Sequence, residues 1–347
     1  MKLSARQEQI IIALLSSNRT LPDLLAIPLL KDSSERTLQR DLGELIMTGF
    51  VDRRGKARAS TYYVTPRGKL QTDLPEPTLE QIFANEYRPP TTYDFARLET
   101  MASLPLFSEE EYHQLDEYHT VFLSKLKNAS PDIIRRERER ISIELAWKSS
   151  QLEGNTYTLL ETESLIKNKT LGKGRTPEET SMILNHKKAL DFTEQNRELF
   201  VRNLTPQTVI ELHKILGQGL ISHGLREGGV GITGSIYRPL ENKYQLHEEL
   251  NRLCRVINAK SSVFDKALLA FVFICYLQPF NDGNKRTGRI LANGLLYAHD
   301  SFPLSLRAVS TNTYKVAMLA FYELGILGNA KQVMLYQAHF AAENYSI

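Results

Sequence analysis

Residues 278–289 read Gln-Pro-Phe-Asn-Asp-Gly-Asn-Lys-Arg-Thr-Gly-Arg, and this stretch decides how the chain is interpreted. The apolar run before it, residues 267–277, is typical of a buried helix. Pro279 cannot continue a helix interior, and Gly283 allows a tight turn that a ligand can approach closely. The sequence therefore predicts a helix, a short loop and a second helix that starts at Asn284.

The start of the second helix is an expected anion site. Backbone N–H groups at a helix N-terminus point outward, and the helix dipole favours negative charge there. Arg286 and Arg289 are one turn apart, so both can reach one anion with forked donors. Asp282 supplies an oxygen ligand suited to a magnesium ion that bridges phosphates. Taken together, these residue types predict a nucleotide-phosphate site rather than a merely solvated basic loop.

The charge of the chain is unevenly divided. The net charge is +3, from 43 Lys and Arg against 40 Asp and Glu. Residues 1–70 hold 12 of the basic and 7 of the acidic residues, so the remainder holds 31 and 33. Because the basic excess lies entirely in the first fifth of the chain, we expect an appended module with a polyanionic partner.

Residues 1–70 are expected to form a compact unit. Apolar spacing predicts helices over roughly 5–17, 21–30 and 35–48, the last with Ser33 or Ser34 as its N-cap and Gly49 as its stop. Extended runs follow near Phe50–Arg53 and Ser60–Thr65, and Pro66 and Gly68 are expected to end the unit.

Three helices and a basic-tipped hairpin resemble a winged helix-turn-helix, in which the third helix enters the DNA major groove and the wing touches phosphates. The DNA-binding candidates are Arg36, Thr37, Gln39 and Arg40 on the third helix and Arg53, Arg54, Lys56 and Arg58 on the wing. A protein-contact or dimerisation module with solvated charges is the alternative. The clustering of charge on the two expected contact elements favours DNA.

The rest of the chain is expected to be mainly α-helical. Residues 71–108, with Pro75, Pro77 and the Pro89-Pro90 pair, are predicted to be a connector, and residues 109–347 a helical domain. Residues 230–237 have the composition of a small β-hairpin.

Composition also limits where the protein works. The two cysteines, Cys254 and Cys275, provide no disulfide framework or metal spacing, and the first residues lack the apolar core of a signal peptide. The longest apolar run, 11 residues, is too short for a membrane span. We therefore expect a cytoplasmic protein without a membrane partner.

Three separated motifs resemble the Fic family, whose signature is His-Pro-Phe-x-(Asp/Glu)-Gly-Asn-(Gly/Lys)-Arg-x-x-Arg. Residues 278–289 match it except at the first position. Ser149-Ser-Gln-Leu-Glu153-Gly154 is similar to the family's inhibitory pattern, Ser/Thr-x-x-x-Glu-Gly/Asn, followed by Asn185-His-Lys-Lys-Ala-Leu. Leu212-His213 and the run from Arg226 to Pro239 resemble the approach to the family's flap. The resemblance covers roughly residues 109–340.

Membership would imply a helical domain that transfers AMP from Mg-ATP to a hydroxyl of a target protein, which can be the chain itself, and a homodimer is common in such proteins. By position, Asp282 would hold Mg²⁺, and the backbone of 283–286 with the Asn284 side chain would cradle phosphates. The β- and γ-phosphate end of ATP would bind Arg286 and Arg289, beside Lys285. The flap, including Gly231, Ile232, Thr233 and Gly234, would align the target by strand addition.

The resemblance also implies an autoinhibitory helix near residues 145–155. Glu153, with Ser149 and Gly154 of the same motif, would occupy the γ-phosphate position at Arg289. A carboxylate and a triphosphate compete for one guanidinium, so the physical chemistry agrees with this role. A structural ion pair on a helix is the alternative.

Gln278 stands where the family has its catalytic His. An amide can orient a hydroxyl but cannot take its proton, which removes an effect of about 10²–10⁴ in rate. Rescue by His213 or His247 is not expected. A natural variant with silenced chemistry, an introduced substitution and an altered reaction all remain open, so the sequence leaves open whether the chain is an active enzyme.

Lys285 is the second departure, because AMP-transferring members often have Gly there and kinase members such as Doc have Lys. Three functions follow: an autoinhibited AMP-transferring scaffold, favoured because Gly283 and the inhibitory segment belong to that branch; Doc-like phosphoryl transfer; and a non-catalytic, nucleotide-responsive DNA-binding regulator. A pure interaction scaffold would not bind ATP.

Overall fold

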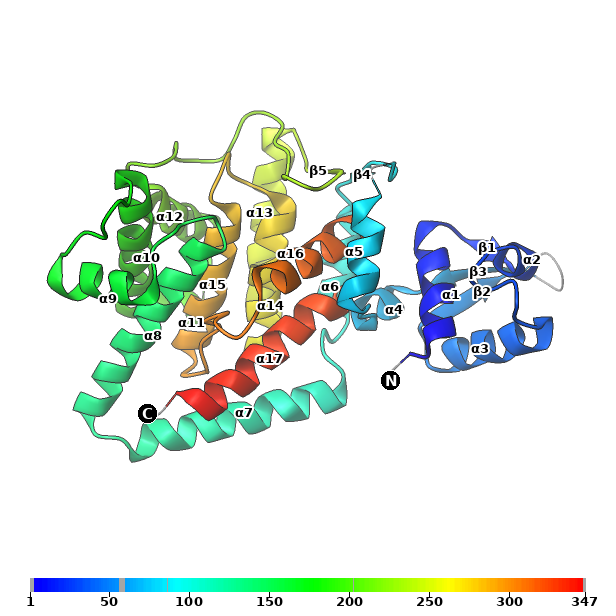
Figure 1. Cartoon of the computed structure of the whole chain (residues 1–347), viewed down its shortest axis with the longest axis horizontal. Coiled ribbons are helices and arrows are strands. Elements are labelled where there is room, and N and C mark those ends of the chain that lie inside the picture. The colour runs from blue at the N-terminus through cyan, green and yellow to red at the C-terminus, as the bar shows by residue number, and fades with distance from the viewer. Residues whose placement is uncertain (1–2, 56–59, 86, 202, 346–347) are drawn as a thin grey trace.

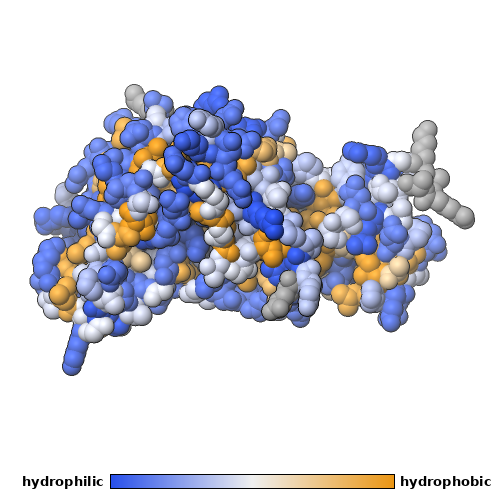
Figure 2. Space-filling model, turned by 90° about the horizontal axis from the view of Figure 1, so that it is seen from above, coloured by the Kyte–Doolittle hydropathy of each residue, from blue (hydrophilic) through white to orange (hydrophobic). Residues whose placement is uncertain are grey.

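The computed structural model describes residues 3–55, 60–85, 87–201 and 203–345. It is mainly helical, as predicted, with two small sheets (Figure 1). A large helical body and a smaller N-terminal unit form two lobes (Figure 1). On the face seen in Figure 2, hydrophobic residues lie in separate patches among hydrophilic ones. Within the described residues, no helix combines the length and apolar character needed to cross a membrane.

The N-terminal unit folds around a small apolar core that includes Ile10, Leu38 and Leu42. Its elements are α1 (Ala5–Ser16), β1 (Arg19–Thr20), α2 (Leu21–Leu25), α3 (Glu35–Met47), β2 (Val51–Arg54) and β3 (Thr61–Val64). The strands form an antiparallel sheet in the order β1-β3-β2. Local signals set the boundaries of α3, because the Ser34 hydroxyl accepts a hydrogen bond from Thr37 N–H and Gly49 adopts φ 76° beyond the helix end.

The apolar core of this unit extends to Val64, whereas Leu70 belongs to the core of the helical body. Pro66 opens a helix that the sequence did not predict, α4 (Pro66–Gln71), with Thr65 as its N-cap. Proline is well suited to the first helical position, because the N–H it lacks would have no partner there.

Residues 71–108 contain more structure than the expected connector. They form α5 (Glu76–Ala84), β4 (Thr91–Thr92) and α6 (Phe95–Ser103). Pro77 lies in the first turn of α5, where it favours a helix rather than a linker. Helix α5 contributes Leu79 to an apolar cluster that also contains Ile12 and Leu15 of α1 and Val316. This cluster joins the N-terminal unit to the helical body.

The helical body surrounds a central pair of antiparallel helices, α14 and α15 (Figure 1). Its elements are α7 (Glu109–Asn128), α8 (Pro131–Gln151), α9 (Leu159–Asn168), α10 (Pro177–Gln195), α11 (Arg197–Val201), α12 (Pro206–Gly217), β5 (Tyr237–Arg238), α13 (Lys243–Ala259), α14 (Val263–Leu277), α15 (Asn284–Ala298), α16 (Thr311–Leu319), the π-helical η2 (Ala320–Leu324) and α17 (Gly328–Asn344).

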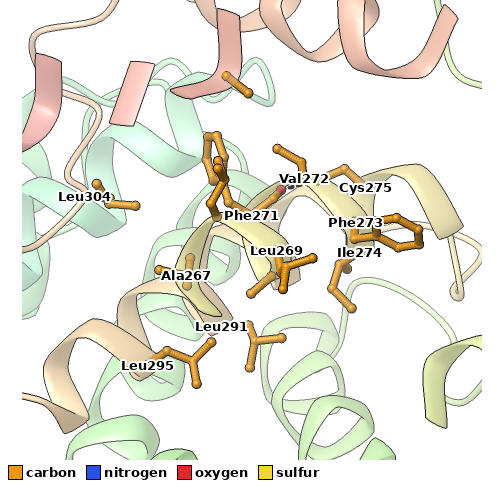
Figure 3. Packing of buried hydrophobic residues seen from close by; sticks show 14 of the residues in the cluster. Ala267, Leu269, Phe271, Val272, Phe273, Ile274, Cys275, Leu291, Leu295 and Leu304 are labelled. Atoms are coloured by element: carbon orange, nitrogen blue, oxygen red, sulfur yellow. Dashed lines mark hydrogen bonds between the residues drawn. The ribbon is translucent and has the colours of Figure 1, made fainter. Parts of the chain in front are cut away.

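The central helices are held by apolar packing. Leu269 of α14 and Leu291 and Leu295 of α15 are almost completely buried in one layer (Figure 3). Each such leucine contributes roughly 1.5–3 kcal/mol relative to exposure. Gly288 allows the close approach, since a Cβ there would lie 3.2 Å from the carbonyl oxygen of Ala270. The packing fixes the loop between the helices.

The predicted β-hairpin at residues 230–237 is wrong. Only Tyr237 and Arg238 form a strand, and they pair in parallel with Thr91 and Thr92. Before them the chain turns at Thr233 and Gly234, where Gly234 adopts φ 79°. Composition suggested a local partner for this strand, whereas its actual partner comes from a distant segment that the sequence did not identify.

Candidate functional site

The loop between α14 and α15 has left-handed backbone at both ends. Gln278 follows the last residue of α14 with φ 51°, and Gly283 precedes the first residue of α15 with φ 78°. A side chain at Gly283 would be strained by this φ and would place its Cβ 3.0 Å from Ile221 Cδ1. Leu277 and Asn284 are thereby brought to the two sides of one tight loop, as the sequence predicts.

The Gln278 side chain cross-links this loop. Its Nε2 donates to the Cys275 carbonyl (2.6 Å), and its Oε1 accepts from Asn284 Nδ2 (2.9 Å). Asn284 Oδ1 in turn accepts from Phe280 N–H (2.9 Å). Gln278 and Asn284 are both buried, and their amide groups form hydrogen bonds within the loop that stabilise its conformation. A neutral amide in this position has no basicity with which to remove a proton.

Asp282 lies at the exposed mouth of the loop. Its side chain is 64% exposed, and Oδ2 pairs with Arg286 Nη2 at 2.9 Å. The described residues hold no group of three or more His, Cys, Asp or Glu side chains that could bind a metal by themselves. Magnesium in nucleotide sites is commonly held by one or two carboxylates together with phosphates and water. A single exposed carboxylate beside a helix N-terminus fits that mode of binding.

The two arginines of the loop have different partners. Arg286 is buried and pairs with Asp282, its own helical neighbour. Arg289, also buried, donates from Nη2 to Glu153 Oε1 (2.8 Å), from Nε to Ser149 Oγ (2.8 Å) and from Nη1 to the Tyr314 hydroxyl (3.1 Å). Glu153 therefore binds Arg289 but not Arg286 in this state.

Glu153 lies just beyond the C-terminal end of α8. The chain turns at Gly154, with φ 91°, and the second carboxylate oxygen of Glu153 lies 3.4 Å from Lys285 Nζ. Burial acts to raise the pKa of Glu153, but the nearby charges of Arg289 and Lys285 outweigh it and lower that pKa to about 2. The carboxylate is thus ionised and is held by two cations of the candidate phosphate site.

A buried hydrogen-bonded chain continues from Arg289 to α10. Ser149 Oγ, which accepts from Arg289, lies 2.9 Å from His186 Nε2, and His186 Nδ1 lies 2.8 Å from the Met182 carbonyl. That carbonyl requires a donor, so Nδ1 carries the proton and Nε2 accepts from the Ser149 hydroxyl. Burial lowers the pKa of His186 to about 3, and the nearby Arg286 and Arg289 act in the same direction.

Site prediction from sequence included neither His186 nor Tyr314. His186 had a signal, because it falls in the Asn-His-Lys-Lys run that follows the Ser149–Gly154 motif. Tyr314 had none, since it reaches Arg289 only through the packing of α16 against the central helices.

The two histidines considered as replacements for a base are otherwise engaged. His213 stacks on Phe280 with ring centroids 3.7 Å apart, and its Nε2 lies 3.0 Å from the Asp282 carbonyl. Burial lowers the pKa of His213 to about 4. His247 is exposed on α13 and contacts Asn251 on the same helix. Neither position suits a general base beside Gln278.

The predicted flap residues belong to a segment whose base, at Arg226, contacts the loop. Gly231, Thr233 and Gly234 are exposed and Ile232 is half-buried. At the base of this segment, Arg226 is fully buried and donates to the Gln278 carbonyl (2.6 Å) and to the carbonyls of Gly228 and Leu240. One guanidinium thus holds both ends of the flap against the loop.

The predicted DNA-contacting residues of the N-terminal unit are mostly solvent-facing. Arg36, Gln39 and Arg40 are exposed at the start of α3, and Thr37 is half-buried. Arg53 and Arg54 are exposed on β2, with Arg54 over the Tyr63 ring at 5.6 Å. Lys56 and Arg58 lie outside the described residues.

Known proteins resemble this chain in sequence and in fold. A model of the Fic/DOC family matches residues 203–296. A protein adenylyltransferase Fic from Nematostella vectensis is 22% identical over 223 residues, covering 63% of this chain and 52% of that protein. Another, from Drosophila yakuba, is 27% identical over 189 residues, covering 52% and 37%. The chain therefore spans about half the length of these relatives or less.

Solved structures share the fold. Fic-1 (residues 134–508) from C. elegans matches with a TM-score of 0.58 and 18% identity, covering 72% of this chain and 80% of that one. A Fic-domain signalling protein from Bacteroides thetaiotaomicron matches with a TM-score of 0.56 and 18% identity, covering 66% and 96%. The segment matched by the family model, residues 203–296, contains the loop and the flap described above. Residues 203–296 therefore match the Fic/DOC family model, and the chain is distantly similar to protein adenylyltransferase Fic.

Proposed function

We propose that this chain is a protein adenylyltransferase scaffold that binds Mg-ATP at residues 282–289 under restraint by Glu153. The observation that carries the proposal is the Glu153–Arg289 pair at 2.8 Å, because it places a carboxylate on the cation that would otherwise face the terminal phosphates. Ser149, Lys285 and Tyr314 also contact this ion pair. The relatives named above are adenylyltransferases, which supports the same activity.

In the proposed reaction a target hydroxyl attacks the α-phosphorus of ATP. The new O–P bond forms as the bond to the β-phosphate breaks, and pyrophosphate leaves. A magnesium ion held at Asp282 would neutralise charge on the phosphates. The backbone N–H groups at the start of α15 and the guanidinium of Arg286 would bind the phosphate oxygens. The Gln278 amide is already bonded within the loop and has no basicity, so the hydroxyl proton would pass to solvent and transfer would be slow.

The target would bind by strand addition at the flap. Strand β5 pairs with β4 on one side only, so within the described part of the chain its second edge has no strand. An extended target segment can add there through main-chain hydrogen bonds.

Calorimetric titration of Mg-ATP tests the restraint. We expect the Glu153→Gly and Glu153→Gln variants to bind Mg-ATP at least about tenfold more tightly than the unaltered chain, because a competing charge-assisted bond is removed. Glu163→Gln is the matched control, since Glu163 pairs with Lys167 on the surface of α9. Equal affinities for all four proteins would contradict the restraint.

Labelled ATP identifies the group transferred. Gln278→His combined with Glu153→Gly should attach label to protein from α-phosphate-labelled ATP. Protein label from the γ-phosphate alone would establish phosphoryl transfer instead, which is the alternative that Lys285 raises. No protein label from either ATP would contradict group transfer.

A DNA-binding regulator that responds to nucleotide is the second candidate. The topology and exposed basic residues of the N-terminal unit support a winged helix-turn-helix role. Ile12 and Leu15 pack in the same cluster as Val316 of α16, and α16 also carries Tyr314, the partner of Arg289. The nucleotide site and the N-terminal unit therefore contact one helix.

Titration with a mixed-sequence DNA duplex should show affinity that falls steeply with salt and changes on addition of Mg-ATP. Affinity insensitive to Mg-ATP would exclude the coupling.

A further inference from the structure

Glu323 of η2 is a buried carboxylate that the proposed reaction does not use. Its side chain is only 2% exposed. Oε1 accepts from the Ser235 hydroxyl (2.7 Å) and from Ile236 N–H (3.2 Å), and Oε2 accepts from Arg88 Nε (2.9 Å). One carboxylate therefore joins the end of the flap to the segment before β4.

The helix that carries Glu323 has an unusual form. Residues Ala320–Leu324 are π-helical, and such short segments frequently occur at functional sites. The Arg97 guanidinium donates to the carbonyls of Phe321 and Tyr322, and Gly325 ends the segment with φ 74°. Arg97 thus satisfies carbonyls that a regular helix would pair, and it stabilises the turn on which Glu323 lies.

The flap is consequently fixed at its ends and exposed between them. Arg226 holds Gly228 and Leu240 at the base, while Glu323 holds Ser235 and Ile236 immediately before β5. Residues 231, 233 and 234, between these attachments, are exposed. The orientation of the exposed part relative to the phosphate loop therefore depends on Glu323 as well as on Arg226.

We propose that Glu323, neutralised by Arg88, is a positioning residue for the protein acceptor. This positioning role rests on the proposed function, since it concerns the segment that would align the target hydroxyl with the α-phosphorus. Glu323 touches neither ATP nor the acceptor hydroxyl. It acts by setting the path of residues 230–236, and it also occupies the Ile236 N–H, which leaves the acceptor strand to pair with the remaining backbone groups of the flap and β5.

Glu323→Gln is the most informative substitution. The amide keeps the shape of the side chain but removes the charge that pairs with Arg88, and its NH2 group cannot accept a hydrogen bond. Buried donors left without acceptors destabilise the local structure. The flap should loosen while the nucleotide site, built from other residues, stays intact.

The test compares two acceptors for the same AMP group. In the background of Gln278→His with Glu153→Gly, α-phosphate-labelled ATP can transfer AMP to a protein hydroxyl or to water. The water reaction releases AMP and pyrophosphate and does not use the flap. The protein acceptor is a size-tagged copy of the unaltered Gln278 chain. Glu323→Gln should lower labelled acceptor relative to released AMP by about tenfold or more, because small misplacements of reacting groups cost up to about 10²-fold. The KM for ATP should not change.

Asp265→Asn is the matched control. Asp265 is another buried acid, bonded to the Tyr112 hydroxyl at 2.6 Å, and it lies at the opposite end of α14 from Gln278. It should lower thermal stability without changing the ratio of labelled protein to AMP. The same ratio in Glu323→Gln and in its parent would overturn the positioning role.

Hydrogen exchange separates this inference from the proposed function, and it is measured on single variants that keep Gln278 and Glu153. Backbone exchange over residues 228–240 should be about tenfold faster in Glu323→Gln and unchanged in Asp265→Asn. If the active-background protein forms neither AMP nor labelled protein, the proposed function fails, and exchange alone then decides whether Glu323 anchors the flap. Unchanged exchange over 228–240 would overturn the anchor.

Discussion

The N-terminal unit and the start of α15 both carry arginines that we assign to binding, but the arginines are exposed in one region and buried in the other. Arg36 and Arg40 of α3 are exposed on a unit with a small core, whereas Arg286 and Arg289 of α15 are buried within a large one. Exposed charges interact weakly and almost independently in water. Buried charges must be matched by partners, so each becomes coupled to the residues around it. Substitutions should therefore have large, interdependent effects in one region and small, additive effects in the other.

The largest expected effect is on catalysis at the buried loop. Restoring a base by Gln278→His, in the Glu153→Gly background, should raise the rate of AMP transfer by about 10²–10⁴-fold, since general-base assistance is typically of that size. Single-turnover labelling with α-phosphate-labelled ATP measures the rate. Gln278→Ala is the control, because it also removes the amide but adds no proton acceptor. An equal gain in both variants would show that loss of the amide, rather than gain of a base, matters.

Stability measurements compare the two regions directly. Arg289→Ala should lower the free energy of unfolding by about 3–5 kcal/mol, because it leaves the Glu153 carboxylate buried beside only one cation. Arg36→Ala should change it by less than about 0.5 kcal/mol. Urea denaturation measures both. Adding Glu153→Gln to Arg289→Ala should recover part of the loss, and strict additivity of these two changes would break the comparison.

Acid should destabilise the buried region through two histidines whose pKa values are lowered. Burial lowers the pKa of His186 to about 3 and that of His213 to about 4, so both stay neutral when folded while the unfolded chain takes up protons below about pH 6.5. The stability associated with them is complete above pH 6.5 and decreases as pH falls toward these values. At pH 5 each contributes a loss of about 2 kcal/mol.

Urea denaturation at pH 7.5 and pH 5.0 checks this loss. His213→Gln should reduce the difference between the two pH values by about 2 kcal/mol. His113→Gln, at an exposed position of α7, is the control and should leave the difference unchanged. The stability contributed by Glu153, whose pKa is lowered to about 2, is complete above about pH 4.5 and is lost only below it, outside this window. A pH-independent free energy of unfolding would contradict the buried neutral histidines.

The smallest effects are expected on the exposed side. If Arg36 and Arg40 contact DNA phosphates, each substitution by alanine should lower the slope of log affinity against log salt by about 1. Fluorescence anisotropy with a mixed-sequence duplex measures the slope. Loss of more than one unit per arginine, or coupling between the two, would mean that these exposed charges behave like the buried ones.

Much of the local structure could be predicted because its causes are local. The N-cap at Ser34, the stop at Gly49 and the break after Leu277 each depend on residues within one turn of the chain. The same holds for the tight turn before α15, where Gly283 adopts φ 78°. Pro77 misled the prediction of a connector, because a proline can open a helix as well as end one.

The amino-acid sequence by itself determined the mainly helical class, the tight loop between α14 and α15 and the absence of a proton acceptor at Gln278, because these depend on residue type and short spacing. Only the tertiary structure decided which groups meet across the chain. It brought Glu153 to Arg289 but left Arg286 with Asp282, and it gave β5 a distant partner in β4. It also joined Glu323 to the flap. The physical reason is that a buried charge is stable only beside a partner. Packing between distant segments, rather than proximity in sequence, determines which partner that is.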